Sequence, residues 1–217
     1  MWKNSEFILL HTTRFGEKSM VLHTLSKEYG RKGFFVKNIS RRSVTSMFFP
    51  LGILEADIME TSRSGLFTAR NPALSYPLSG IRNDLRKSAI SIFISEVLYR
   101  VVKEGLTDRP LYDMCEKNIL LLDAMEEDFS NFHLYFLLEF IMALGFSPEP
   151  HDLAPFMGER MSLVSDFIGK PFSEAMLVPL TGEMRNEIAE KLLKYIEFHT
   201  ESAVNVNSLK ILHELFL

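Results

Sequence analysis

The first third of the chain is a series of short segments with β-strand character, and this pattern constrains the fold more than any other feature. The segments are rich in aromatic and β-branched residues, and turn signals such as the Gly-containing Arg14–Lys18 connection separate them. Five such strands within about 65 residues cannot leave two sheet edges bare in water, so we expect a small closed barrel. The predicted strands are Glu6–Thr13, Ser19–Leu25, Arg31–Lys37, Leu51–Thr61 and Leu66–Arg70.

After a linker with two prolines, Pro72–Gly80, the apolar residues recur every three or four positions, which predicts helices. Asp108 and Thr181 are typical N-cap residues, and Gly145 is a typical C-cap glycine. Residues 146–180 contain five prolines and are expected to be irregular. The predicted helices run from Asn83 to about Lys103, from Asp108 to about Met125, from Ser130 or Asn131 to Gly145, from Thr181 to about Ser202, and from Ser208 onward.

Charge is divided unevenly along the chain. The 217 residues carry a net charge of -4, but residues 1–70 have 11 Lys/Arg against 6 Asp/Glu, a net of +5. Residues 71–217 have the remaining 13 Lys/Arg against 22 Asp/Glu, a net of -9. This segregation predicts two modules with different partners, and the basic module suits a polyanion.

The stretch Lys27–Arg42 concentrates the positive charge, with six cations against the single acid Glu28. Strand alternation places Arg31, Phe35 and Lys37 on one face and Phe34 on the other. Cations beside an exposed ring are what a single-stranded nucleic acid needs, for phosphates and for base stacking. The alternative is that both phenylalanines belong to the core and the cations only solvate the surface.

No catalytic pattern is present in the sequence: there is no Gly-rich phosphate loop, HExxH or G-x-S-x-G motif. Cys115 is the only cysteine, on an apolar helix face, which favours a core thiol in a reducing compartment. The six histidines are scattered, and no metal or cofactor site is expected. No signal peptide or membrane span is visible. We therefore expect a cytoplasmic protein that is not an enzyme.

Six groups of residues stand out, in order along the chain: Glu6–Leu10, Phe15–Ser19, Glu28–Arg31, Val36-Lys37 with Arg41-Arg42, Leu144–Glu149, and Tyr195–His199 with Ser208–Lys210. Together they resemble the bacterial recombination mediator RecO family. In that family a strand is followed by a "Y-G-E-x-D"-like turn, an "E-H-G-R"-like turn and a "K-G-x-R-R"-like basic loop. An "L-G-Y-x-P" helix end and a "Y-L-E-Y-H … L-K-S" element follow.

The resemblance implies an α+β protein: an N-terminal five-stranded OB-fold barrel over residues 1–78, then a mostly α-helical domain over residues 79–217. It also implies a recombinational repair mediator that binds single- and double-stranded DNA and promotes strand annealing. Such proteins engage the C-terminal tail of single-strand-binding protein and, with RecR, assist RecA loading at the nucleoid. The alternative is a non-enzymatic adaptor whose barrel binds a protein rather than DNA.

Two groups of site residues follow from the charge pattern and the resemblance. The expected DNA-binding residues are Arg14, Lys27, Arg31, Lys32, Phe35, Lys37, Arg41 and Arg42. The expected partner-binding residues are Arg82, Arg86, Lys87, Arg185, Lys191 and Lys194.

Two departures from the family pattern concern local structure. Many relatives carry four zinc-binding cysteines after the "L-G-Y-x-P" element, but residues 150–170 contain none, so no zinc is expected here. Asn38 follows Lys37 where the family usually has glycine, which leaves the backbone geometry of the basic loop open.

Overall fold

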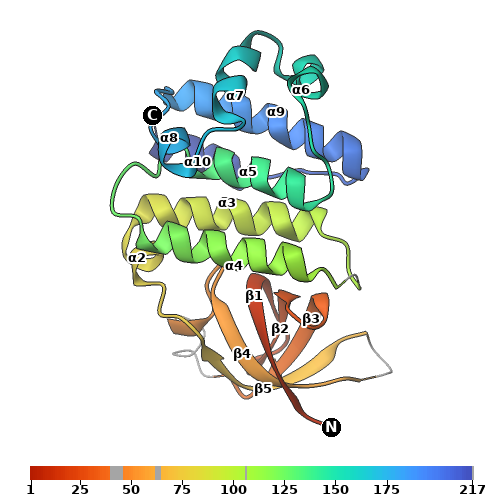
Figure 1. The fold of residues 1–217 in the computed structure, drawn as a ribbon. Helices are drawn as coiled ribbons and strands as arrows, with labels where there is room; N and C mark the ends of the chain where they lie inside the picture. The colour runs from red at the N-terminus through yellow and green to blue at the C-terminus, as the bar shows by residue number, and fades with distance from the viewer. Residues whose placement is uncertain (40–45, 62–64, 106, 217) are drawn as a thin grey trace. The chain divides into compact units, whose positions relative to one another are not determined.

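The N-terminal strands close into a barrel, as the sequence predicts (Figure 1). The structure, a computed structural model, describes residues 1–39, 46–61, 65–105 and 107–216. The strands pair in the order β1-β2-β3-β5-β4, and β4 returns to β1. The pairing of β3 with β5 is parallel and the others are antiparallel. The strands are β1 (Lys3–Arg14), β2 (Ser19–Ser26), β3 (Gly30–Lys37), β4 (Ile53–Met59) and β5 (Phe67–Leu74).

Alternate residues of each strand fill the barrel, which confirms the period-two interpretation. Phe34 is fully buried, and its ring meets the ring of Phe7 edge to face, with the centroids 5.1 Å apart. Such aromatic pairs contribute about 0.5–1.5 kcal/mol beyond the apolar area that they bury. The buried barrel core comprises Phe7, Leu9, Met20, Leu22, Phe34, Val36, Leu54, Ala56, Ile58 and Ala69.

The last strand is longer than predicted. Pro72 was expected to begin the linker, but β5 continues through it to Leu74. The register between β4 and β5 shifts at this point, and Asn71 has a positive φ of 54°. A bulge of this kind leaves a residue outside the hydrogen-bonded ladder, so a proline without an N–H group can be accommodated in the strand.

The basic loop begins with a left-handed residue. Asn38 has a φ of 59°, a conformation that glycine adopts freely and that asparagine tolerates better than most residues. Asn38 therefore adopts, directly after Lys37, a left-handed conformation that a glycine would also suit.

The chain divides into two compact units. The first comprises Met1–Leu78 and Val102–Glu116, so it includes the beginning of helix α4 (Arg109–Ala124). The second comprises Ser79–Val101 and Lys117–Leu217. None of the helices within the described ranges is long and apolar enough to cross a membrane.

The long helices occupy the predicted positions, and two predicted caps are confirmed. Asp108 accepts a hydrogen bond from the backbone N–H of Leu111 at 2.9 Å. Thr181 accepts one from the N–H of Met184 at 3.2 Å. Besides α4, these helices are α3 (Leu85–Val101), α5 (Phe132–Ala143), α9 (Gly182–Thr200) and α10 (Ser208–Leu215), and the short α2 (Ser79–Asn83) precedes α3.

The expectation that residues 146–180 are irregular is wrong. They contain α6 (Pro150–Met157), a 3₁₀ turn (Gly158–Arg160), α7 (Met161–Phe167) and α8 (Phe172–Met176). Pro150 is the first residue of α6 and Pro171 is the N-cap of α8, positions at which no intrahelical N–H bond is needed. These prolines begin helices rather than prevent them.

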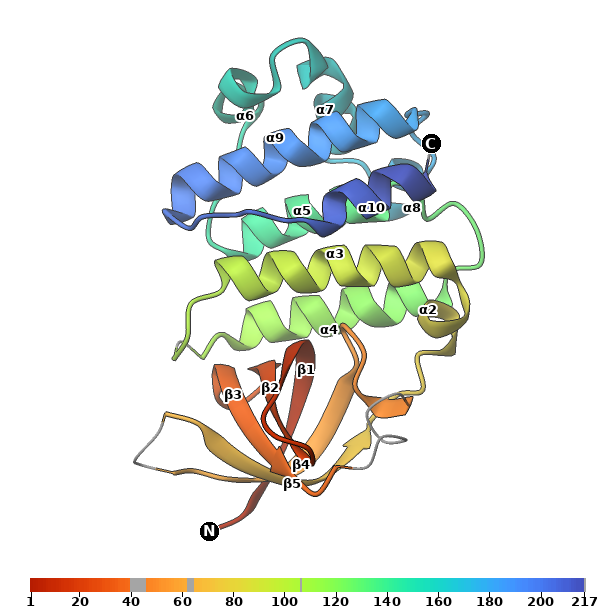
Figure 2. The same ribbon diagram turned by 180° about the vertical axis from the view of Figure 1, so that it is seen from behind.

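In the second unit α5 lies between α3 and α9, as both views show (Figures 1 and 2). Eight of the twelve α5 residues are buried, which makes this helix the centre of the apolar core. Helix α10 packs on α3 and α9, and Glu96 of α3 caps its first turn by accepting the backbone N–H of Ser208 at 3.0 Å. Burial alone raises the pKa of Glu96, but hydrogen bonds from Ser208 and Asn207 and the nearby Arg100 lower it overall.

We predict that the segment of α6 and α7 is stabilised by apolar packing without a metal. Leu153 is fully buried, so Leu153→Ala should reduce the free energy of unfolding by about 2–5 kcal/mol. Leu177→Ala provides a matched control, because this leucine is exposed and its loss should cost less than about 0.5 kcal/mol. Chelation should leave the melting temperature unchanged. One zinc per chain by elemental analysis, together with destabilisation by the chelator, would contradict the prediction.

Candidate nucleic-acid interface

One outer surface of the barrel combines aromatic rings with cations. Phe35 points out of the barrel and is half-buried, and its ring meets that of Phe15 edge to face at 5.7 Å. The Lys37 Nζ lies 5.6 Å from the centroid of the Phe35 ring. Phe15 is 66% exposed, and Arg14 beside it is also exposed. We call Arg14, Phe15, Phe35 and Lys37 the aromatic face.

Strand register brings the aromatic face together. Ser19 on β2 pairs with Lys37 on β3, and Val21 pairs with Phe35. The N–H of Phe15 donates to the carbonyl of Ser19 at 2.9 Å, which closes the β1–β2 hairpin next to the same pair. The turn therefore places Phe15 beside the end of β3, although the two segments are separated in sequence.

The glycine at the centre of β3 allows the side chain of Leu66, just before β5, to approach the same surface. A Cβ atom on Gly33 would lie 2.5 Å from the Cδ2 atom of Leu66, closer than real Cβ contacts. A glycine inside a strand often marks such a close approach. In OB folds generally, oligonucleotides bind to the face of strands 2 and 3 and to the loops that connect strands 1 and 2 and strands 4 and 5.

Two histidines extend this surface along β1 and β2. The rings of His11 and His23 have centroids 5.7 Å apart, and the His23 Nε2 lies 3.0 Å from the Thr13 hydroxyl. Burial lowers the pKa of His23, and His11 and Arg31 lower it further. The lowered pKa favours the neutral imidazole of His23 over the charged form.

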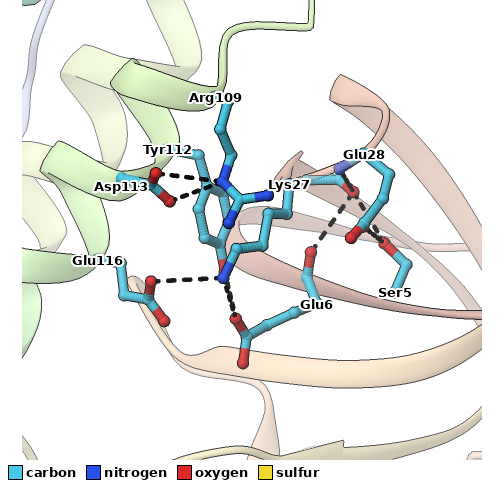
Figure 3. Close-up of polar contacts among 9 residues, drawn as sticks. Ser5, Glu6, Lys27, Glu28, Arg109, Tyr112, Asp113 and Glu116 are labelled. Carbon is cyan, nitrogen blue, oxygen red and sulfur yellow. Dashed lines mark hydrogen bonds and ion pairs between the residues drawn. The ribbon is translucent and has the colours of Figure 1, made fainter.

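Lys27 belongs to an internal network of the first unit rather than to the aromatic face (Figure 3). Its Nζ lies 3.3 Å from a Glu6 carboxylate oxygen and 3.8 Å from Glu116, and 5.2 Å from the centroid of the Tyr112 ring. The Tyr112 hydroxyl donates to Glu6 at 3.2 Å. Burial raises the pKa of Glu116, and the neighbouring Glu6 raises it further. The ammonium group therefore compensates two partly buried carboxylates.

Two cations of β3 are also engaged within the first unit. The Arg31 Nη1 donates to the carbonyl of Val102 at 2.7 Å, and the Arg31 carbonyl accepts the N–H of Gly105 at 3.3 Å. Arg31 thus anchors the chain that leads into α4. The Lys32 Nζ lies 4.6 Å from the centroid of Phe67, away from the aromatic face.

The structure therefore divides the predicted DNA-binding residues. Arg14, Phe35 and Lys37 lie on the aromatic face, Lys27, Arg31 and Lys32 lie elsewhere, and Arg41 and Arg42 fall outside the described residues. Sequence reasoning missed Phe15. The available signal was an aromatic residue in a turn between Arg14 and Lys18, where turn geometry alone does not require an apolar side chain.

Among the predicted partner-binding cations, three serve the second unit's own structure. Lys87 is buried and donates to the carbonyls of Asp123, in the last turn of α4, and Met125, just after that helix. Arg185 donates to the Phe216 carbonyl at 3.0 Å, and burial lowers its pKa.

The third of these cations is Lys191, which donates to the Met157 carbonyl at 3.1 Å. The remaining three, Arg82, Arg86 and Lys194, have exposed side chains.

Comparison with known proteins identifies the family. Residues 1–72 match the family model described as "Recombination protein O N terminal". Residues 82–154 match the family model described as "Recombination protein O C terminal". The chain belongs to the RecO family. It is 28% identical to the DNA repair protein RecO of Phocaeicola vulgatus, covering 96% of this chain and 97% of the relative. It is 29% identical to that of Bacteroides fragilis with the same coverage, and 31% identical to that of Flavobacterium johnsoniae over 67% of this chain and 63% of the relative.

We predict that Lys27 and Lys37 have separable roles. Lys27→Met leaves two partly buried carboxylates without their cation, so it should reduce the free energy of unfolding by about 1–3 kcal/mol, between the values for exposed and buried pairs. The control Lys37→Met removes an exposed lysine and should leave melting unchanged. Only Lys37→Met should change the salt dependence of DNA binding. Equal effects of both substitutions on DNA binding, with normal melting, would refute the assignment.

Proposed function

We propose that this RecO-family protein is a non-enzymatic mediator of recombinational repair that holds single-stranded DNA on its aromatic face. The observation that carries the proposal is the exposed Phe15 beside Phe35 and Lys37 on the barrel surface. Isolated exposed phenylalanines are common, but two adjacent rings beside a lysine form a platform for stacking bases and binding a phosphate. The relatives are named DNA repair proteins, which agrees with this use of the surface.

Such a face suits annealing because it holds the backbone and stacks bases without reading their sequence. Stacking of a base on an aromatic ring contributes about 1–3 kcal/mol and tolerates every base. We infer that the protein also binds double-stranded DNA through its cations, engages the tail of single-strand-binding protein, and acts with RecR to assist RecA loading. These roles require positioning of strands and partners rather than bond chemistry.

The alternative function is an adaptor whose barrel binds a protein. This alternative would gain support if the cations of Lys37–Arg42 were neutralised by the protein's own acids. Lys37 has no acidic partner among the residues that the structure describes, and its ammonium lies over Phe35 instead. An exposed, unneutralised lysine beside two rings favours a polyanion as the ligand.

The aromatic face predicts two distinct responses in DNA-binding measurements. Phe15→Ala and Phe35→Ala should each weaken binding of single-stranded DNA by about 1–3 kcal/mol, with little change in the salt slope. Neutralising Lys37, Arg41 and Arg42 together should flatten the log–log salt slope by about 2 units, because each lost phosphate contact removes about 0.7. Fluorescence anisotropy with a labelled oligonucleotide at several salt concentrations measures both quantities.

Phe198→Ala is the matched control, since it removes an exposed phenylalanine from the second unit. This substitution should alter neither the affinity for single-stranded DNA nor the salt slope. Melting curves of each variant distinguish lost DNA contacts from lost stability. An unchanged salt slope in the triple variant, with unchanged affinity in both phenylalanine variants, would favour the adaptor instead.

The exposed arginines Arg82 and Arg86 give a test of partner binding. The tail of single-strand-binding protein is acidic with an apolar end, so a receptor needs cations around an apolar surface. The Arg86 guanidinium lies 5.2 Å from the buried Phe129 ring, and the neighbouring Leu85 is 71% exposed, so an apolar side chain lies beside the exposed arginines. Replacing both arginines with alanine should abolish the calorimetric signal of the tail peptide, whereas Lys194→Ala should not. Loss of the signal in Lys194→Ala, with a normal signal in the double arginine variant, would instead place the peptide site on α9.

A further inference from the structure

A hollow of about 510 Å³ lies at one end of the barrel, beside the aromatic face. Its floor consists of Val36 and Ala69, two residues of the barrel core. The rings of Trp2 and Phe48 line it, together with the apolar side chains of Ile39 and Met47. Volumes between about 300 and 1,000 Å³ are typical of sites that bind small ligands. The hollow therefore has the size and apolar lining of a binding site.

A prearranged stack forms the polar side of the hollow. The Arg70 guanidinium lies 4.1 Å from the centroid of the Trp2 ring, and its Nε donates to Asp57 at 3.2 Å. Asn71 donates to the same carboxylate at 3.2 Å, so Asp57 holds both side chains in place. Within the described ranges the Nη groups of Arg70 have no acceptor, and they remain able to bind an anion.

Lys37 connects the hollow to the aromatic face. It lines the hollow, and its ammonium also lies over the ring of Phe35. A ligand that extends from Phe35 into the hollow passes this ammonium, which suits a phosphate between two nucleotides. Flat aromatic walls, an apolar floor and cations at the rim together match one nucleotide: a planar base with an attached phosphate.

We propose that the hollow receives one unstacked nucleotide of a single-stranded DNA bound on the aromatic face. The base occupies the space between Trp2 and Phe48, and Lys37 and Arg70 bind the flanking phosphates. This inference rests on the proposed DNA binding of the aromatic face and adds to it a specific subsite. Lys37 joins the hollow to the aromatic face, so one ligand must contact both. This favours DNA over an acidic peptide, because DNA carries a phosphate between successive bases and a peptide does not.

Trp2 is the only tryptophan of the chain, so its emission reports directly on the hollow. Addition of a twelve-residue oligothymidylate should quench this emission and protect Trp2 from quenching by acrylamide. Trp2→Ala should weaken binding of the oligonucleotide about 5- to 150-fold, the range expected for one stacked base. Trp2→Phe keeps an aromatic wall and should restore most of the affinity.

Comparison with Phe15→Ala distinguishes this inference from the proposed function. Weaker binding in Phe15→Ala, with normal affinity in Trp2→Ala and unchanged tryptophan emission, would refute the subsite and leave the aromatic face intact. Failure of the wild-type protein to bind the oligonucleotide would refute both. Quenching of Trp2 by an acidic peptide with an aromatic carboxyl terminus, but not by the oligonucleotide, would assign the hollow to a protein partner and overturn the proposal.

Discussion

The parallel pairing of β3 with β5 is the contact on which the barrel and its surface depend. It joins three residue pairs, Phe34 with Phe67, Phe35 with Thr68 and Val36 with Ala69, and it removes the last open edges of the sheet. Because side chains alternate along a strand, the register that buries Phe34 also places Phe35 outside. The stability of the core and the presentation of the aromatic face thus follow from the same pairing.

The distribution of charge in space differs from its distribution in sequence. The stretch Lys27–Arg42 reads as a single basic segment, but Lys27 and Arg31 are engaged by the segment at 102–116, far along the chain. Sequence reasoning could place Phe35 and Lys37 on one strand face because alternation is a local property. The network of Lys27 required knowledge of a tertiary contact, and the neighbouring residues carry no sign of it.

The extent of the helical fold could be predicted where local signals agree. Apolar periodicity and the caps Asp108 and Thr181 located the long helices, and alternation located the strands. Residues 146–180 were misinterpreted because prolines both begin and interrupt helices, and composition alone does not distinguish the two positions. Asp152 accepts the backbone N–H of Glu149 at 2.9 Å at the start of α6, but Glu-x-x-Asp departs from the usual Ser/Thr-x-x-Glu/Gln capping pattern, so no motif marked this helix in the sequence.

The net charge of the first unit bears on the proposed binding of DNA. Residues 102–116 add four acids and two cations, so the unit carries 13 Lys/Arg against 10 Asp/Glu, a net of +3 rather than the +5 of residues 1–70. Lys27 is moreover compensated by two carboxylates. A surface with so few unneutralised cations releases few counterions, which limits the electrostatic share of its affinity. In the proposed DNA complex, stacking of bases on Phe15 and Phe35 must then supply a larger share of the binding free energy, and that share persists when salt screens the charges.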